Sequence, residues 1–270
     1  MTTAQVPGTP APQVPGSPTT PPTTPTLPLS QSATQRNLTL TIEALDSTQT
    51  PRVLFAPGEP ITLVARYTNN GTTDETLTST DGCGITDETI DGRFGGVSSP
   101  VFNRLYQAMC TMILIRHTIA AGQSKETSHT WDQLDNAGGA VPRGNYRFTG
   151  SLRGSGTFPW PTPLEIGIGD NVVRVQGTAL NNGIVPSEAR VSVGLEKVTV
   201  SQSRNQTALQ TAQAIAQAID ATADYAAVAT DLGGDVAEVR VGLASTIASP
   251  YHPVVYDVTA NDPAQQVTAP

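Results

Sequence analysis

The sequence contains no cluster of basic residues and no long apolar run. Lys and Arg together number 15 against 23 Asp and Glu, which gives a formal net charge of -8 at pH 7. Nucleic-acid-binding surfaces gain most of their affinity from clustered cations that meet phosphates, so we expect no nucleic-acid partner. A bilayer crossing takes about 20 consecutive, mostly apolar residues. No such run occurs, and we expect no membrane insertion.

Signatures of catalysis and of metal binding are also absent. The sequence has no Gly-x-Ser-x-Gly, Walker, His-Glu-x-x-His or Cys-x-x-Cys motif. None of its three histidines has a Cys or a second His at metal-ligand spacing: His117, His129 and His252. Residues 87–92 offer oxygen ligands, but Ser98 stands where a calcium loop needs a bidentate Glu, so we interpret them as an acidic loop. We expect no enzymatic activity, no catalytic or metal-binding residue and no cofactor.

The first 20 residues lack the basic segment and the apolar segment of a secretory signal peptide. Two explanations remain open. Either Met1 replaces a removed signal peptide on a secreted protein, or the protein leaves its cell by lysis, as virion components do.

Cysteine is scarce, and both copies fall in the first half of the chain. Cys83 and Cys110 are compatible with a disulfide that closes a loop of about 26 residues, worth about 3 to 4 kcal/mol in the chain-entropy model. Two buried thiols are the alternative. A disulfide would imply exposure to an oxidising medium.

Residues 1–36 are dominated by Pro, Thr, Gln and Ser. This composition has too little apolar surface to offset the entropy of ordering, so it predicts a flexible, extended arm. The arm is either a passive linker or a segment that threads across a neighbouring subunit in an assembly.

Residues 37–153 change abruptly to apolar-polar alternation, with Leu38, Leu40 and Ile42 on one face of the first strand. Further short strands are separated by turns such as Asn69-Asn70-Gly71. They are expected at residues 61–67, 112–117, 125–131 and 145–152. The pattern predicts a mainly β protein that begins with an antiparallel β-sandwich.

Residues 154–163 hold Pro, Gly and two aromatic residues, Phe158 and Trp160, which indicates a linker between domains. Buried aromatics often anchor such joints, so we expect both side chains to pack in the seam between the domains. A ligand-contacting role is the alternative.

Residues 164–260 predict a small α+β sandwich domain with one amphipathic helix, followed by a flexible tail at 261–270. Thr207 and Gln210 form a Thr-x-x-Gln capping box, which marks the start of the helix. Its apolar stripe faces a sheet. Strands are expected around residues 172–175, 191–200, 225–230, 236–243 and 254–258, with a tight hairpin or bulge across 194–197.

Three segments of the first domain match a known family: Phe55-Ala-Pro-Gly-Glu-Pro, Thr130-Trp-Asp132 and Val141-Pro-Arg-Gly-Asn-Tyr146. Residues 37–152 thereby resemble the BsuPI type of immunoglobulin-like domain, named after an intracellular proteinase inhibitor. The resemblance implies an immunoglobulin-like β-sandwich, and it implies protease inhibition less directly because such sandwiches host unrelated functions. Residues 164–259 are more loosely similar to modules of bacteriophage structural proteins.

Two functions follow as hypotheses. The first is a non-enzymatic structural or decoration protein of a bacteriophage virion, in the capsid or the tail, or of a similar extracellular assembly. The second is a secreted or cell-surface bacterial binding protein or proteinase inhibitor. Both predict other protein subunits as partners, and we expect a partner-contact loop that contains Phe94, Phe102 and Tyr106.

Overall fold

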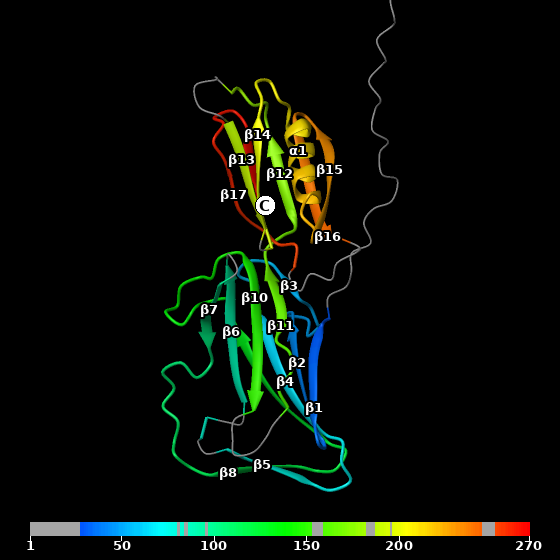
Figure 1. Cartoon of the computed structure of the whole chain (residues 1–270). Coiled ribbons are helices and arrows are strands. Elements are labelled where there is room, and N and C mark those ends of the chain that lie inside the picture. Colours follow the sequence, from blue (N-terminus) through cyan, green and yellow to red (C-terminus); the bar gives the residue numbers. More distant parts are fainter. Residues whose placement is uncertain are drawn as a thin grey trace, which may run out of the picture.

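The computed structural model describes residues 28–79, 82–83, 86–94, 97–152, 159–181, 187–194, 196–244 and 252–270. These residues form two β-rich units that stand one above the other (Figure 1). Their longest helix has 13 residues, which is too short to cross a bilayer.

The first unit is a β-sandwich, as predicted, and its strands pair antiparallel except for the short parallel pair of β3 with β11. One sheet has the strand order β1-β2-β4-β9, and the other has the order β3-β11-β10-β6-β7. The first sheet consists of β1 (Ser30–Gln35), β2 (Leu38–Leu45), β4 (Ile61–Asn69) and β9 (Ser124–Trp131). The second consists of β3 (Leu54–Phe55), β11 (Leu164–Ile168), β10 (Gly144–Leu152), β6 (Thr86–Phe94) and β7 (Val97–Asn103).

Apolar and polar side chains alternate along the strands, and the apolar ones fill the space between these sheets. Leu40 and Ile42 on β2 are fully buried, whereas Thr41 between them is half-buried on the outer face. Trp131 lies at the end of β9, with its ring 5.8 Å from that of Tyr146 in an edge-on arrangement. A separate two-stranded ribbon, β5 (Glu75–Ser79) with β8 (Ile115–Ile119), lies below the sandwich (Figure 1).

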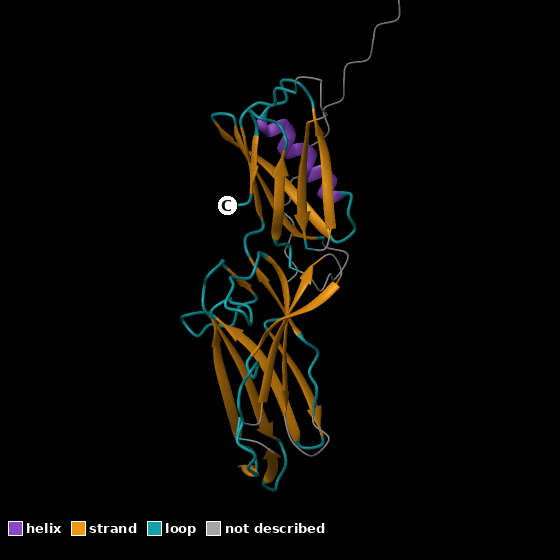
Figure 2. Cartoon of the chain, turned by 90° about the vertical axis from the view of Figure 1, so that its left-hand side faces the viewer, coloured by secondary structure: helices purple, strands orange, loops and turns teal. Residues whose placement is uncertain are grey.

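The second unit combines two sheets and the helix around one core. The sheets have the orders β15-β16-β12-β18 and β14-β13-β17, and Figure 2 shows the helix crossing the strands of this unit. The elements are β12 (Val172–Gln176), β13 (Ser187–Val193), β14 (Glu196–Gln202), α1 (Ala208–Asp220), β15 (Tyr225–Gly233), β16 (Val236–Leu243), β17 (Val255–Ala260) and β18 (Gln266–Thr268).

The helix begins where the sequence predicts. The Thr207 side chain accepts from the Gln210 backbone N–H, and the Gln210 side chain accepts from the Thr207 backbone N–H at 3.0 Å. The expected tight hairpin joins β13 to β14. Gly194 lies in its turn at φ +59°, and an added Cβ would overlap the Tyr225 hydroxyl, so only glycine fits there.

The two units meet through a buried amide-histidine contact. The Asn145 amide on β10 donates to the His252 carbonyl at 3.2 Å and accepts from the His252 backbone N–H at 2.9 Å. The imidazole Nε2 of His252 lies 2.9 Å from the Glu165 carbonyl oxygen, which can only accept, so Nε2 carries the proton. Asn145 and His252 are both buried.

Three predicted boundaries are wrong. Residues 30–35, assigned to the flexible arm, form β1 because their backbone pairs with β2; residues 1–27 of the arm lie outside the description. Residues 164–168 belong to the first unit, since Leu164, Ile166 and Ile168 pack in its core. Within the expected tail, 266–268 form β18, where Val267 packs into the second core.

Two predictions for single segments also fail. Trp160 is 66% exposed and does not fill the seam, where Asn145 and His252 make the buried contact instead. Phe158 and residues 154–157 of the linker lie outside the described residues. Residues 87–92 form part of strand β6 and not a loop, because each pairs with β10.

Candidate functional site

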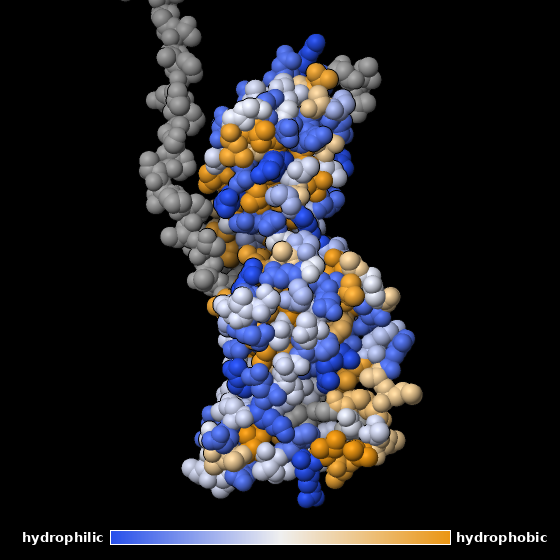
Figure 3. Space-filling model, turned by 180° about the vertical axis from the view of Figure 1, so that it is seen from behind, coloured by the Kyte–Doolittle hydropathy of each residue, from blue (hydrophilic) through white to orange (hydrophobic). Residues whose placement is uncertain are grey.

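The segment 104–114, here called the contact loop, joins β7 to β8 and exposes large apolar side chains. Met109 and Met112 are 100% and 95% exposed, and three further residues are more than half exposed: Tyr106, Ile113 and Leu114. The loop runs down one flank of the first unit in Figure 1. Figure 3, which views the molecule from behind, shows apolar side chains gathered at the lower end of this unit. Contiguous exposed apolar side chains of this kind mark interaction surfaces.

The contact loop is held at its middle by a disulfide. Cys83 and Cys110 are bonded, with their Cα atoms 5.1 Å apart, and of the two alternatives left open by the sequence the structure has the disulfide. Beside it, the Gly82 N–H donates to the Thr111 carbonyl at 2.7 Å. An added Cβ on Gly82 would overlap the Thr111 hydroxyl, which would have to rotate away.

The loop is held at its start by Arg104. Its guanidinium pairs with the buried Glu88 carboxylate on β6 and donates to the backbone carbonyls of Cys83, at 3.3 Å, and of Thr86. The Arg104 backbone N–H also donates to the Glu88 carbonyl at 3.1 Å. One side chain therefore joins the loop, the disulfide and the sandwich, and charge-assisted hydrogen bonds are the stronger kind.

A small cavity of about 270 Å³ lies behind this anchor. Its walls are polar, and two aromatic rings, those of His129 and Phe102, stack at 5.5 Å beside it. The lining residues are Cys83, Thr86, Glu88, Arg104, Thr127, Ser128 and His129. Arg104 neutralises the charge of Glu88, so this ion pair presents no unpaired charge to a ligand in the cavity. We interpret the lining residues as a support for the contact loop.

The three residues expected in the partner-contact loop have different positions. Tyr106 is 53% exposed in the contact loop. Phe102 is the last residue but one of β7 and packs against the core and the His129 ring, so it supports the loop without being its apex. The side chain of Phe94 lies outside the description. Met109 and Met112 were missed, although an apolar run next to a cysteine was the available signal.

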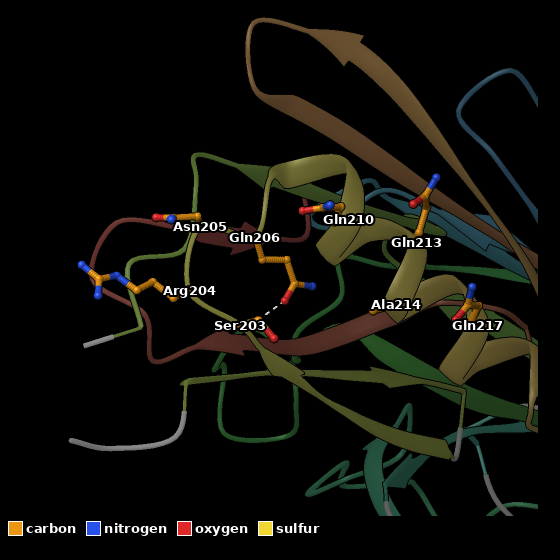
Figure 4. Close-up of a pocket in the computed structure, with 8 residues that line it drawn as sticks. All are labelled: Ser203, Arg204, Asn205, Gln206, Gln210, Gln213, Ala214 and Gln217. Carbon is orange, nitrogen blue, oxygen red and sulfur yellow. Dashed lines mark hydrogen bonds between the residues drawn. The ribbon is translucent and has the colours of Figure 1, made fainter. Parts of the chain in front are cut away.

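A second, shallow hollow lies beside the start of α1 (Figure 4). Its volume is about 500 Å³, and its lining is rich in amides: Ser203, Arg204, Asn205, Gln206, Gln210, Gln213, Ala214 and Gln217. The Gln206 amide oxygen accepts from the Ser203 backbone N–H at 2.6 Å, so it serves the turn before the helix. The lining contains no carboxylate, histidine or cysteine, and therefore no general base beside the Ser203 hydroxyl to activate it.

Elsewhere in the described part of the chain, ionisable groups gather in ion pairs at the surface, such as Arg66 with Glu43 and Glu126. No three His, Cys, Asp or Glu residues there are placed to hold a metal ion. Burial lowers the pKa of His252 to about 4. Its backbone N–H donates to Asn145, so His252 has a structural role in the junction. Desolvation also raises the pKa of Glu165, although Arg147 at 3.0 Å offsets part of that effect.

Comparisons with known proteins give no family. No protein-family model and no curated protein matches the sequence. Partial similarities to solved structures include a β-glucosidase from Listeria innocua in complex with gluconolactone, with 11% identity and a TM-score of 0.27, over 47% of this chain and 16% of that one. A β-glucosidase from Erythrobacter marinus has 10% identity and a TM-score of 0.29, over 47% and 14%.

An alkylpurine DNA glycosylase from Pseudomonas fluorescens, bound to DNA with an abasic site analogue, has 12% identity and a TM-score of 0.30, over 48% of this chain and 30% of that one. This chain thus spans less than a third of the length of each of these proteins. Similarities at this level carry no argument about function.

Proposed function

We propose that the chain is a non-enzymatic structural or decoration component of a multi-subunit particle, such as the capsid or tail of a bacteriophage virion. The observation that carries this proposal is the contact loop, which exposes Met109 and Met112 almost completely while Arg104 holds its start and a disulfide holds its middle. Burying each such side chain against a partner contributes about 1.5 to 3 kcal/mol. A loop ordered beforehand loses less entropy on binding.

Other features support an assembly role. Two small β-rich units offer one surface for docking and another for display. The composition of residues 1–27, which are rich in Pro and Thr, is typical of a tether. The sequence has no known catalytic motif. The resemblance of the first unit to BsuPI-type domains supports a binding scaffold.

Co-sedimentation with particles from the producing culture tests the proposal. We expect the full chain to migrate with particles in a density gradient, at a stoichiometry that repeats with particle symmetry. A variant with Met109→Ser, Met112→Ser and Leu114→Ser should bind at least about tenfold more weakly. The matched control carries Val228→Ser and Leu232→Ser, which are also exposed and lie on β15.

A chain found only as a free monomer, with no particle in the gradient, would overturn this proposal. Equal binding by the contact-loop variant and the β15 control would show that another surface docks. Circular dichroism and thermal unfolding of both variants separate loss of binding from loss of fold.

The same loop supports a second candidate, a proteinase inhibitor. An exposed segment fixed by a disulfide is suited to present an extended chain to an active site, and this candidate rests on the Cys83–Cys110 bond. Titration against a panel of serine proteases decides between the two. Stoichiometric inhibition that Met109→Ser or Met112→Ser weakens favours the inhibitor, whereas no inhibition at micromolar protein removes it.

A further inference from the structure

The sheet edges of the described residues carry features that oppose pairing with another chain, with one exception. Natural edge strands are protected by charge, proline, bulges or shortness. The protected edges are β9 (Lys125, Glu126), β14 (Glu196, Lys197), β17 (Asp257), β5 (Glu75), β8 (Arg116), β7 (Pro100 and a register shift), β15 (Asp231 and a register shift), β3 with two residues and β18 with three.

The exception is β1, the outer strand of the first sheet. Its sequence, Ser-Gln-Ser-Ala-Thr-Gln, has six residues without charge or proline, and its pairing with β2 is regular from end to end. Within the described residues no strand pairs with its outer side. A long, regular and uncharged edge is a template for another strand.

The register of β1 shows which backbone groups face outward. A two-residue turn, Arg36-Asn37, joins β1 to β2, and such turns close on a hydrogen-bonded pair, here Gln35 with Leu38. Hydrogen-bonded and non-hydrogen-bonded pairs then alternate. The N–H and C=O groups of Ser30, Ser32 and Thr34 therefore point away from β2. The short Ser32–Thr41 and Thr34–Thr39 hydroxyl contacts, at 2.8 and 2.7 Å, agree with this assignment.

We propose that β1 pairs antiparallel with β1 of a second copy of this chain, around a two-fold axis at Ser32. In this register Ser32 faces Ser32 of the other copy, and Ser30 faces Thr34, so every outward-pointing residue of β1 meets another one. The two first sheets then continue as one sheet across the dimer. Such an isologous contact uses the same surface on both copies, so it gives a closed dimer and does not extend into a filament.

The chemistry of β1 favours a second copy over other strands. Self-pairing requires that identical side chains tolerate each other, and Ser, Thr and Gln both donate and accept hydrogen bonds without repulsion. The residues before β1 are unsuited to the same edge. Between Pro7 and Pro28 a proline occurs at least every third residue, and proline has no N–H to donate to a ladder.

A cysteine placed on the axis tests the pairing. Directly opposed residues of a hydrogen-bonded antiparallel pair have Cα atoms about 5.5 Å apart, within the range that a disulfide spans. Full-length Ser32→Cys with oxidised glutathione should therefore form a covalent dimer at least about tenfold faster than the control Ser124→Cys on the charged β9 edge. Both serines are exposed, and mass spectrometry identifies the linked peptide.

Charge at the same position gives a second test. In sedimentation velocity across the micromolar range, the wild-type chain should associate to a dimer. Ser32→Lys, which brings two ammonium groups together on the axis, should weaken it at least about tenfold, and Ser124→Lys should not. A wild-type chain that stays monomeric, or equal cross-linking at positions 32 and 124, overturns the proposal. Neither outcome bears on docking through the contact loop, which its own variants test.

Discussion

At the scale of single residues, Arg104 shows how one side chain can fix a surface loop. Its partner Glu88 has only 2% of its side chain exposed, while Arg104 keeps 24%. Removing the cation leaves a buried carboxylate without its partner, which is more costly than losing an exposed pair. The stability of the contact loop therefore depends on a charge that lies beneath it.

We expect Arg104→Met to lower the free energy of unfolding by about 3 kcal/mol. Arg52→Met is the matched control, because Arg52 pairs with Glu59 at 3.0 Å but is 43% exposed, and it should cost less than about 1 kcal/mol. Urea unfolding measures both. The double variant Arg104→Met with Glu88→Leu should recover most of the loss. Similar values for the two single variants would contradict the assignment of Arg104 as the anchor.

Two buried tyrosines offer a comparison between a satisfied and an unsatisfied hydroxyl. The Tyr146 hydroxyl donates to the Pro142 carbonyl. The Tyr67 hydroxyl lies beside the Thr127 and Thr86 hydroxyls without a hydrogen bond of ordinary geometry to either, and burial raises its pKa to about 12. An unsatisfied buried hydroxyl costs stability that its removal restores.

Tyr67→Phe should therefore leave the free energy of unfolding unchanged or raise it by up to about 1 kcal/mol. Tyr146→Phe, which removes a hydrogen bond from an equally buried ring, should lower it by about 1 kcal/mol. Thermal unfolding of the two variants beside the wild type gives the comparison. Destabilisation by Tyr67→Phe as large as that by Tyr146→Phe would show that the Tyr67 hydroxyl has a partner in solution.

At the scale of elements, signals that are local in sequence were predictable and pairing between distant segments was not. The start of α1 follows from Thr207 and Gln210, three residues apart. The hairpin of β13 and β14 follows from a change in the phase of alternation. The strands β1 and β18 have at most one apolar residue each, so their sequences carry no alternation that could reveal them.

The same distinction holds within the candidate site. Cys83 and Cys110 could be singled out because cysteine is rare here. The pairing of Arg104, at the start of the contact loop, with Glu88 on β6 joins positions 16 residues apart, and no local pattern marks it. The prediction that Trp160 is buried was wrong because an aromatic residue flanked by prolines occurs both in buried and in exposed segments, and the local sequence does not distinguish them.

The cap of α1 provides a prediction for an element. Thr207→Ala removes the acceptor for the Gln210 N–H and should lower the free energy of unfolding by about 1 kcal/mol. Gln217→Ala, on the exposed face of the same helix, should change it by less than about 0.5 kcal/mol. Chemical denaturation followed by far-ultraviolet circular dichroism measures both. Equal effects would show that the capping box does not contribute in solution.

At the scale of the whole molecule, the junction between the units contains a buried histidine, His252. His252 is enclosed by β10 and β11, where its Nε2–H donates to the Glu165 carbonyl and its backbone pairs with Asn145. Desolvation lowers its pKa from 6.5 to about 4. The folded state therefore holds the neutral imidazole, whereas the unfolded chain takes up a proton near pH 6.5.

This difference fixes the sign of the pH dependence. Above about pH 6.5 His252 is neutral in both states, and its full contribution to stability is present. As the pH falls from about 6.5 to about 4, the unfolded state gains a proton that the folded state excludes, and about 3 kcal/mol is lost, at about 1.4 kcal/mol per pKa unit. The raised pKa of Glu165 acts in the opposite direction, because its folded form binds a proton more readily.

We expect the free energy of unfolding of the wild-type chain to fall across this window, and the fall to be smaller by about 3 kcal/mol in His252→Gln. Urea titrations at a series of pH values measure the slope, which is informative even if His252→Gln is less stable at every pH. His129→Gln is the control, because it removes a histidine that stacks on Phe102 and leaves the contacts of His252 in place. Since the His252 contacts join the two units, the wild-type chain should also become more sensitive to proteolysis between them near pH 5.2, about midway through this window. A slope that His252→Gln leaves intact would place the pH-sensitive group elsewhere.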